Sequence, residues 1–224
     1  MEITLDFETF PVGEALRYLG CAQQDEDSRR LVTEALGPLL SSIHPRYLWR
    51  LLPLERISDK LSAGGLPLEG SDIRRHLEGC DRALLFCATL GHEADQLLRR
   101  TQVEDLSKAV VLDSCCTAAI EEVCDRAEEQ MKARLPGAFF TTRYSPGYGD
   151  LPLTIQEAFL SLLEAPKRLG LCASDSSILT PRKSVTAIIG VSEHPLTPAG
   201  QRRCESCSAR ENCPYRKKEE YCGR

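Results

Sequence analysis

The sequence TTRYSPGYGD, residues 141–150, combines one Arg, two Tyr, two Gly and one Pro within ten residues. Pro146 stiffens the turn, and Gly147 and Gly149 lack Cβ atoms, so their backbone can approach a ligand closely. Tyr148 stands between the two glycines, where its ring has little steric cover and is expected to be exposed. Both a tight structural turn and a ligand-binding loop fit these residues.

Arg143 distinguishes this loop from an ordinary surface turn. It follows a predicted strand, residues 139–144, that leads directly into the loop. From the end of a strand a guanidinium can hold a ligand carboxylate by two parallel hydrogen bonds. The alternative is an arginine with a purely structural role.

Upstream of the loop, the sequence predicts a long helix from Val103 to Leu135 with a break near Asp113. Its apolar residues recur at steps of three and four and mark the core face: Leu112, Cys116, Ile120, Val123, Ala127 and Met131. Beside this face, Asp113, Thr117, Glu121 and Asp125 follow one another at intervals of four and form a polar stripe. Such a stripe is either a solvated helix face or the acidic wall of a binding site.

The remaining segments alternate irregularly between helix and strand patterns. Strands or extended segments are predicted at residues 1–7, 47–56, 83–89, 171–179 and 184–191, the last with Val185, Ala187, Ile189 and Val191 alternating. Helices are predicted at residues 13–19, 25–42 (core face Leu31, Ala35 and Leu39), 71–77 (capped by Ser71), 92–101 and 153–163. There is no regular βαβ repeat, no GxGxxG after a strand and no Walker-type loop, which disfavours Rossmann and P-loop folds. The predicted class is α+β with a largely antiparallel sheet.

Composition narrows the class of protein further. The formal net charge of the 224 residues is −5, which argues against a nucleic-acid-binding protein. The longest apolar run, residues 83–90, is too short to cross a bilayer, and no leader pattern opens the sequence, so we expect a cytoplasmic protein that does not bind membranes. In a reducing compartment the cysteines before residue 200 are expected to be small buried side chains rather than disulfides.

The loop and the segments around it resemble the activation domain of cobalamin-dependent methionine synthase. That family has an Arg-x-x-Pro-Gly-Tyr loop, a proline soon after it and a downstream Pro-x-x-Ser-Val segment. These features correspond to Arg143, Pro146, Gly147, Tyr148, Pro152, Pro181, Ser184 and Val185, and residues 118–121 resemble the family's long helix. The resemblance is specific from about residue 105 to 195.

The resemblance implies a C-shaped α+β domain with a twisted, mainly antiparallel sheet flanked by helices. It further implies a shallow groove that binds S-adenosylmethionine and docks onto a cobalamin domain whose cofactor has been oxidised to cob(II)alamin. One electron, from a donor such as a flavodoxin or ferredoxin, and the methyl group of the ligand then regenerate methylcobalamin. The chain itself is not expected to turn over alone, because the cobalamin is carried by the partner, a methionine synthase or its corrinoid domain.

The resemblance also assigns roles to individual residues. It implies that Arg143 pairs with the methionyl carboxylate and that the backbone around Ser145 and Gly147 contacts the adenosyl part. The resemblance implies that Tyr148 faces the corrin, which makes it the predicted catalytic residue. It also implies that an acid of the long helix, which we assign to Glu121, binds the ligand's ammonium or ribose. Asp113, on the same acidic stripe, is the second candidate. The chain departs from the family after the Ser-Val pair, where residues 188–190 replace a segment that commonly contains a second Tyr.

A cysteine-rich tail follows the predicted activation-like domain of residues 1–200. Residues 201–224 contain the spacing C-x2-C-x5-C-x8-C, at Cys204, Cys207, Cys213 and Cys222, and carry seven Lys or Arg against four Glu. Four clustered thiols suit an iron–sulfur cluster or Zn²⁺, and basic neighbours offset the charge of a four-thiolate centre. The consumption of an electron in the implied reaction favours the cluster slightly, and a tail with exposed thiols and no metal is the remaining alternative.

The sequence therefore predicts an S-adenosylmethionine-binding reactivation subunit that acts in trans on a cobalamin-dependent methionine synthase. Two other interpretations remain open. One is an iron–sulfur or zinc protein that reactivates another corrinoid methyl-transfer protein. The other is a small-molecule-binding scaffold without a role in the reaction.

Overall fold

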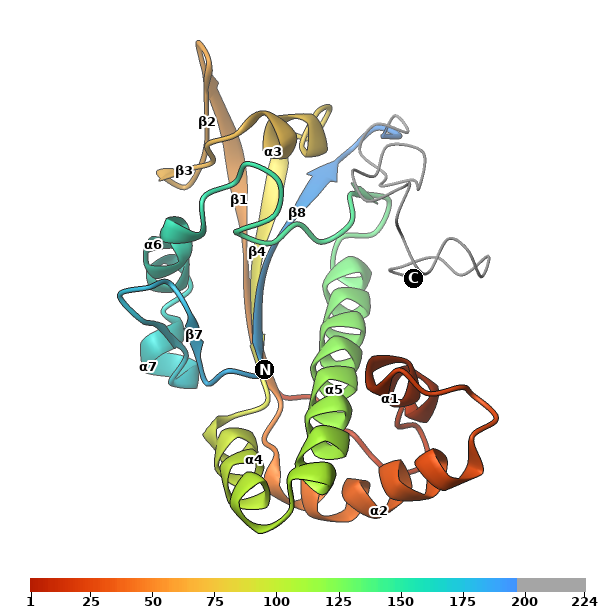
Figure 1. The fold of residues 1–224 in the computed structure, drawn as a ribbon. Helices are drawn as coiled ribbons and strands as arrows, with labels where there is room; N and C mark the ends of the chain where they lie inside the picture. Colours follow the sequence, from red (N-terminus) through yellow and green to blue (C-terminus); the bar gives the residue numbers. More distant parts are fainter. Residues whose placement is uncertain (197–224) are drawn as a thin grey trace.

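The computed structural model describes residues 1–196 (Figure 1). The predicted boundary between residues 200 and 201 and the four tail cysteines lie outside the described residues.

A six-stranded sheet forms the centre of the molecule, with the strand order β3-β2-β1-β4-β8-β5. Every strand pairing recorded in this sheet is antiparallel. The strands are β1 Arg46–Ile57, β2 Lys60–Ala63, β3 Leu66–Pro67, β4 Arg82–Thr89, β5 Phe139–Phe140 and β8 Ser184–Ser192. A separate two-stranded ribbon consists of β6 Cys172–Ala173 and β7 Leu179–Thr180.

Helices cover both faces of the sheet (Figure 1). They are α1 Val12–Leu19, α2 Glu26–Ser42, α3 Ser71–His76, α4 His92–Glu104, α5 Leu106–Ala133, α6 Gln156–Leu162 and α7 Ala165–Leu169, with a 3-10 turn, η1, at Leu153–Ile155. Helices α1, α2, α4 and α5 contribute to one hydrophobic core, and α3, α6 and α7 contribute to a second. The α+β class with an antiparallel sheet flanked by helices is thus confirmed.

The central strands are apolar on both sides because each core uses alternate residues of the same strand. In β4, Leu84 and Phe86 belong to the α5 side, whereas Leu85 and Cys87 belong to the α6 side. In β8 the predicted alternating set faces α5, but Ile188 between its members is also fully buried, in the other core. This double burial explains why residues 83–89 form an uninterrupted apolar run.

Helix α5 is the longest element and is continuous through Asp113, so the predicted break is wrong. The interruption lies earlier, at Asp105, whose side chain accepts a hydrogen bond of 3.1 Å from the Lys108 N–H and caps the helix. The predicted core face is confirmed, since all six of its members are buried. Two i,i+4 ion pairs on its polar side, Glu122–Arg126 and Glu128–Lys132, stabilise the helix.

Near the amino terminus, one prediction is wrong and a second is confirmed only in part. Residues 1–7 do not form a strand and contribute only an isolated bridge between Glu2 and Arg46. In α2 the predicted Leu39 is buried and the predicted Ala35 is half-buried, but Leu31 is exposed, and Val32 and Leu36 complete the buried face. Apolar spacing alone did not distinguish these neighbouring faces, because both contain apolar residues at steps of three or four and both include Leu39.

The cysteines before residue 200 were predicted to be buried, and most of them are. Cys80, Cys87, Cys115, Cys116 and Cys124 are buried free thiols, and burial raises the pKa of Cys80 to about 11 and that of Cys87 to about 12. Cys21 is half-buried and Cys172 is exposed, so the prediction fails for these two.

Candidate functional site

The segment that carries Arg143 runs along β8 beyond the end of β5. The Thr141 N–H donates to the Gly190 carbonyl at 3.0 Å, and Tyr144 exchanges two backbone hydrogen bonds with Ile188, at 2.9 and 2.8 Å. The Tyr144 ring is buried in the core on the α6 side. Since successive side chains of an extended chain point to opposite faces, Arg143 points toward α5.

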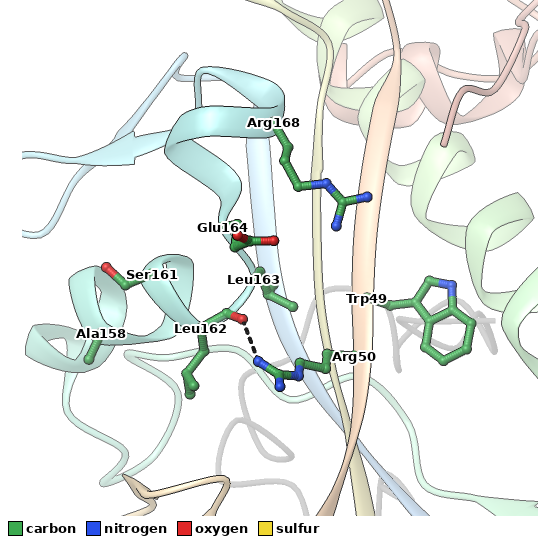
Figure 2. A pocket seen from close by; sticks show the side chains of 8 residues that line it. All are labelled: Trp49, Arg50, Ala158, Ser161, Leu162, Leu163, Glu164 and Arg168. Atoms are coloured by element: carbon green, nitrogen blue, oxygen red, sulfur yellow. Dashed lines mark hydrogen bonds between the residues drawn. The ribbon is translucent and has the colours of Figure 1, made fainter.

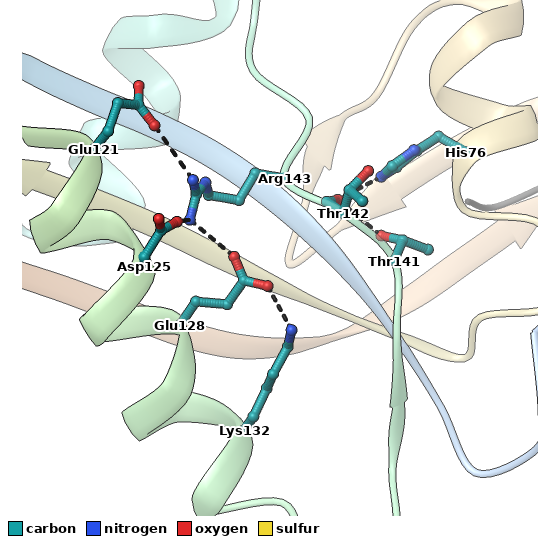
Figure 3. A network of polar contacts seen from close by, with 8 residues as sticks. All are labelled: His76, Glu121, Asp125, Glu128, Lys132, Thr141, Thr142 and Arg143. Carbon is teal, nitrogen blue, oxygen red and sulfur yellow. Dashed lines mark hydrogen bonds and ion pairs between the residues drawn. The ribbon is translucent and has the colours of Figure 1, made fainter. Parts of the chain in front are cut away.

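Arg143 meets three carboxylates of α5 (Figure 3). Its Nη1 lies 2.7 Å from Asp125 Oδ1 and 3.0 Å from Glu128 Oε2, and its Nη2 lies 3.3 Å from Glu121 Oε2. The three acids are spaced four and three residues apart, so they share one face of the helix. The stripe predicted from the sequence therefore faces the guanidinium at Glu121 and Asp125, and Glu128 belongs to it as well.

Burial and charge act in opposite directions on these groups. Burial raises the pKa of Glu121 and of Asp125, and the opposing effect of the Arg143 guanidinium does not fully offset it. Burial also works against the charged form of Arg143, but the neighbouring acidic groups raise its pKa above the ordinary value. The guanidinium thus stays charged, and the two acids hold their protons more tightly than exposed carboxyls do.

A groove of about 790 Å³ opens beside this cluster. Its acidic and basic side is formed by α5 and Arg143, and its other side by the beginning of β8, Gln156 and Leu179. The lining residues that the sequence analysis predicted for the site are Arg143, Ser145, Tyr148 and Glu121. The structure therefore brings these four together in one concave surface.

The turn of residues 145–151 forms one end of the groove. The Tyr148 N–H donates to the Ser145 carbonyl at 3.1 Å, and the Gly147 N–H donates to the Leu151 carbonyl at 2.9 Å. Gly147 has a φ of +89°, which favours glycine, although it is not among the groove-lining residues. Tyr148 is 50% exposed, as predicted, and lies on the groove.

Gly149 has a structural reason to be glycine. Its φ is +52°, and a Cβ atom there would collide with the carboxylate of Asp72 in α3. The close approach expected of this residue is thus made to the protein itself. Sequence patterns do not indicate this contact, because Asp72 is distant from Gly149 along the chain.

Helix α3 holds the loop at two points. The His76 Nε2–H donates to the Thr142 carbonyl at 2.8 Å, next to Arg143 (Figure 3). At the other end, the Asp150 carboxylate accepts hydrogen bonds from the backbone N–H groups of Ser71, at 2.6 Å, and Asp72, at 3.0 Å. Ser71 was predicted to be the helix cap, but it is the first helical residue, and Asp150 supplies the capping carboxylate.

Asp113 lies elsewhere on α5 and does not line the groove. Its carboxylate pairs with Lys183 at 2.9 Å, and Lys183 also donates to the Thr117 hydroxyl at 2.8 Å. The polar stripe is therefore divided, with its first half engaged by Lys183 and its second half by Arg143.

Sequence analysis missed several groove residues, among them Glu128, Glu129 and Lys132 of α5 and the buried pair Thr186 and Gln156. The Thr186 hydroxyl donates to Gln156 Oε1 at 2.8 Å, and both side chains are buried at the base of the groove. A polar residue in an otherwise apolar strand was the available signal for Thr186. Residues 188–190 replace the segment in which the resembling family commonly has a second Tyr. Here Ile188 and Ile189 are fully buried in the two cores and do not line the groove.

A second pocket, of about 850 Å³, lies between β1 and the α6–α7 pair (Figure 2). Arg50 crosses it to donate to the Leu162 carbonyl at 3.2 Å, while Trp49 lies on the opposite side of the strand. The pocket contains none of the predicted site residues. Because the contact of Arg50 ties α6 to the sheet, we assign this pocket a packing role.

Within residues 1–196, no cluster of three or more His, Cys, Asp or Glu side chains has the geometry to hold a metal ion. The predicted metal ligands Cys204, Cys207, Cys213 and Cys222 lie outside that range. In the same described part, no helix is both long and apolar enough to cross a membrane.

The fold and the groove define an α+β protein with a charged, concave site beside strand β8 of an antiparallel sheet. Among solved structures, the chain is similar to the crystal structure of the MetH reactivation domain bound to AdoHcy, with a TM-score of 0.65 and 16% sequence identity. The match covers 98% of this chain and 86% of the other. Neither a family model nor a curated protein matches the sequence. At this identity the match establishes a shared fold, that of the reactivation domain.

Proposed function

We propose that this chain binds S-adenosylmethionine in the Arg143 groove and reactivates the cobalamin of a methionine synthase carried on another polypeptide. The observation that carries the proposal is the convergence of Arg143, Ser145, Tyr148 and Glu121 on one groove. The similarity in fold to a reactivation domain bound to AdoHcy supports the same ligand class.

The charges of the groove suit the amino-acid end of this ligand, which carries a carboxylate and an ammonium. Of the three contacts of Arg143, the one to Glu121 is the longest, at 3.3 Å. The ligand carboxylate takes the place of Glu121 on the guanidinium, and Glu121 then faces the ammonium. The exchange keeps every charge paired, so binding does not leave a stranded ion in a partly buried site.

The share of this chain in the reaction is to position the methyl group. One electron reduces cob(II)alamin to the cob(I) state, whose cobalt attacks the methyl carbon. The S–CH₃ bond breaks, its electron pair stays on sulfur, and methylcobalamin and S-adenosylhomocysteine result. Holding the sulfonium against the partner's corrin contributes proximity rather than new chemistry. In this proposal Tyr148, which is half exposed and lines the groove, faces the corrin.

The electron comes from a donor such as a flavodoxin or ferredoxin. By their spacing in the sequence, four thiols of this chain suit an iron–sulfur cluster or zinc: those of Cys204, Cys207, Cys213 and Cys222. An iron–sulfur cluster there favours a second candidate function, the reactivation of another corrinoid methyl-transfer protein.

A reactivation assay in trans tests the proposal. A methionine synthase that lacks its own reactivation domain is prepared with its cofactor in the cob(II)alamin state. It is then mixed with reductant, methyl-labelled S-adenosylmethionine and this protein. Label in methylcobalamin, formed only when the protein is present, supports the proposal. Ligand binding without label transfer supports a scaffold instead, and transfer to a different corrinoid protein alone supports the second candidate.

A further inference from the structure

The groove beside Arg143 has more negative than positive side chains. Its lining contains four carboxylates, on Glu121, Asp125, Glu128 and Glu129, and two cationic groups. Both cations already have acidic partners, since Arg143 pairs with three of the acids and Lys132 pairs with Glu128 at 2.6 Å. Glu129 is exposed and forms no ion pair within the described part of the chain.

Among residues 1–196, no further cation lines the groove. Arg17 acts on Glu121 from outside the lining, but it is itself paired with Glu14. Lys183, the residue before β8, is not among the groove-lining residues and pairs with Asp113 and Thr117. A zwitterionic amino-acid end uses one guanidinium and one carboxylate of the groove. The remaining carboxylates then still outnumber the remaining cation, so the excess persists after such an end has bound.

We propose that the groove is selective for ligands with a net positive charge, and that it therefore binds the methyl donor more tightly than the demethylated product. This inference rests on the proposed function. S-adenosylmethionine carries one positive charge more than S-adenosylhomocysteine, on its sulfonium. Two excess charges about 8 Å from the sulfonium, in a water-like dielectric, give a preference of about fivefold.

This preference gives ligand exchange in the groove a direction, from demethylated product to fresh methyl donor. Methyl transfer neutralises the sulfonium, so the product loses the attraction of the acidic wall at the moment it forms. Fresh donor then displaces it without any conformational change. The specificity for the methyl donor is determined by Asp125, Glu128 and Glu129. Glu121 does not contribute to it, because it binds the ammonium that both ligands carry.

Calorimetry with three probes tests the inference. S-adenosylmethionine and sinefungin, which has an ammonium in place of the sulfonium, are each expected to bind about fivefold more tightly than S-adenosylhomocysteine at low salt. At about 1 M salt, where the Debye length is only about 3 Å, the preference falls below about twofold. Equal affinities for all three ligands at low salt would overturn the inference and leave the proposed function intact. Failure of all three to bind would overturn both.

A pair of single-charge variants locates the effect. Glu129→Gln removes an exposed acid of the groove and is expected to reduce the preference to about twofold, with thermal stability unchanged. Glu104→Gln removes an exposed acid at the end of α4, near the start of α5 and about 35 Å from Glu129 along that helix, and leaves the preference at about fivefold. An equal effect of both variants would show that overall charge, and not the groove wall, sets the preference, and the inference would be wrong.

Discussion

The Asp150 carboxylate lies 2.6 Å from the backbone nitrogen of Ser71, although 79 residues separate the two along the chain. It also accepts a hydrogen bond of 2.7 Å from the Ser71 hydroxyl. The last residue of the loop that carries Arg143 and Tyr148 is therefore fixed to the beginning of α3. Together with the bond from His76 to Thr142, this contact defines the path of the loop from both ends.

Replacing Asp150 by Ala is expected to loosen the loop. The hydrogen bond from the Ser71 hydroxyl, followed by those from the backbone N–H groups of Asp72 and Ser71, lowers the pKa of Asp150 from its ordinary 3.8. Its contribution to stability is therefore complete above pH 3.8 and is lost as the pH falls through the lower, folded-state pKa. Thermal unfolding between pH 2 and 7 should show a smaller acid-induced drop in Tm for Asp150→Ala than for the wild type. A parallel drop in both proteins would contradict this role.

Arg143→Gln is expected to abolish most ligand binding. The variant loses the cation for the ligand carboxylate and leaves three acids without their shared partner, at a cost of about 2–5 kcal/mol of binding free energy. Arg143→Gln should also lower Tm, because three acids lose their shared partner. The companion double variant Arg143→Gln/Asp125→Asn removes one of these unpaired charges, so it should recover part of the loss in Tm without recovering binding. Wild-type affinity of Arg143→Gln in calorimetry would exclude Arg143 from the site.

Glu121 and Asp113 are both candidates from the same helix stripe, and the structure separates them. Glu121→Gln should weaken binding about tenfold, the size of a lost charged hydrogen bond, without lowering Tm, because burial raises the pKa of Glu121 and its charge is not favoured by folding. Asp113→Asn should change affinity less than about twofold, since Asp113 pairs with Lys183 away from the groove. The two affinities measured side by side decide between the candidates, and a stronger effect at Asp113 would reverse the assignment.

Tyr148 should matter for reactivation more than for ligand binding. Its ring is half exposed on the groove, while its backbone carbonyl accepts the Tyr144 hydroxyl at 3.0 Å, a bond that side-chain variants keep. Tyr148→Ala is expected to slow methyl transfer at least about tenfold with affinity changed less than about threefold, because positioning is lost and not binding. Tyr148→Phe is the control, and normal reactivation by it would assign the role to the ring. Unchanged rates for both variants would assign Tyr148 to the turn alone.

The tail cysteines predict a metal centre that can be measured directly. Protein purified without oxygen should contain either iron and sulfide with visible absorption, or one equivalent of zinc without colour. Cys204→Ser and Cys213→Ser should each reduce the metal content, whereas Cys172→Ser, which removes an exposed thiol of the described domain, should not. Protein without stoichiometric metal would leave the thiols without this function.

Sequence patterns predicted the long elements well because those elements bury one continuous face. The core face of α5 was identified from its spacing, and β4 and β8 from their apolar character. Short elements were predicted less well. The amino-terminal segment lacks a partner strand along most of its length, and the beginning of α3 is capped by a residue from elsewhere in the chain.

Within the site, the sequence by itself determined which residues are chemically suited to a ligand: a guanidinium after a strand, glycines with special backbone angles, and acids at four-residue intervals. Only the tertiary structure decided which acids meet Arg143, because the crossing of α5 over β8 brings Glu121, Asp125 and Glu128 to the guanidinium and leaves Asp113 to Lys183. Helical periodicity defines a stripe along the whole length of a helix. Where another element crosses that stripe depends on long-range packing, which local sequence does not encode.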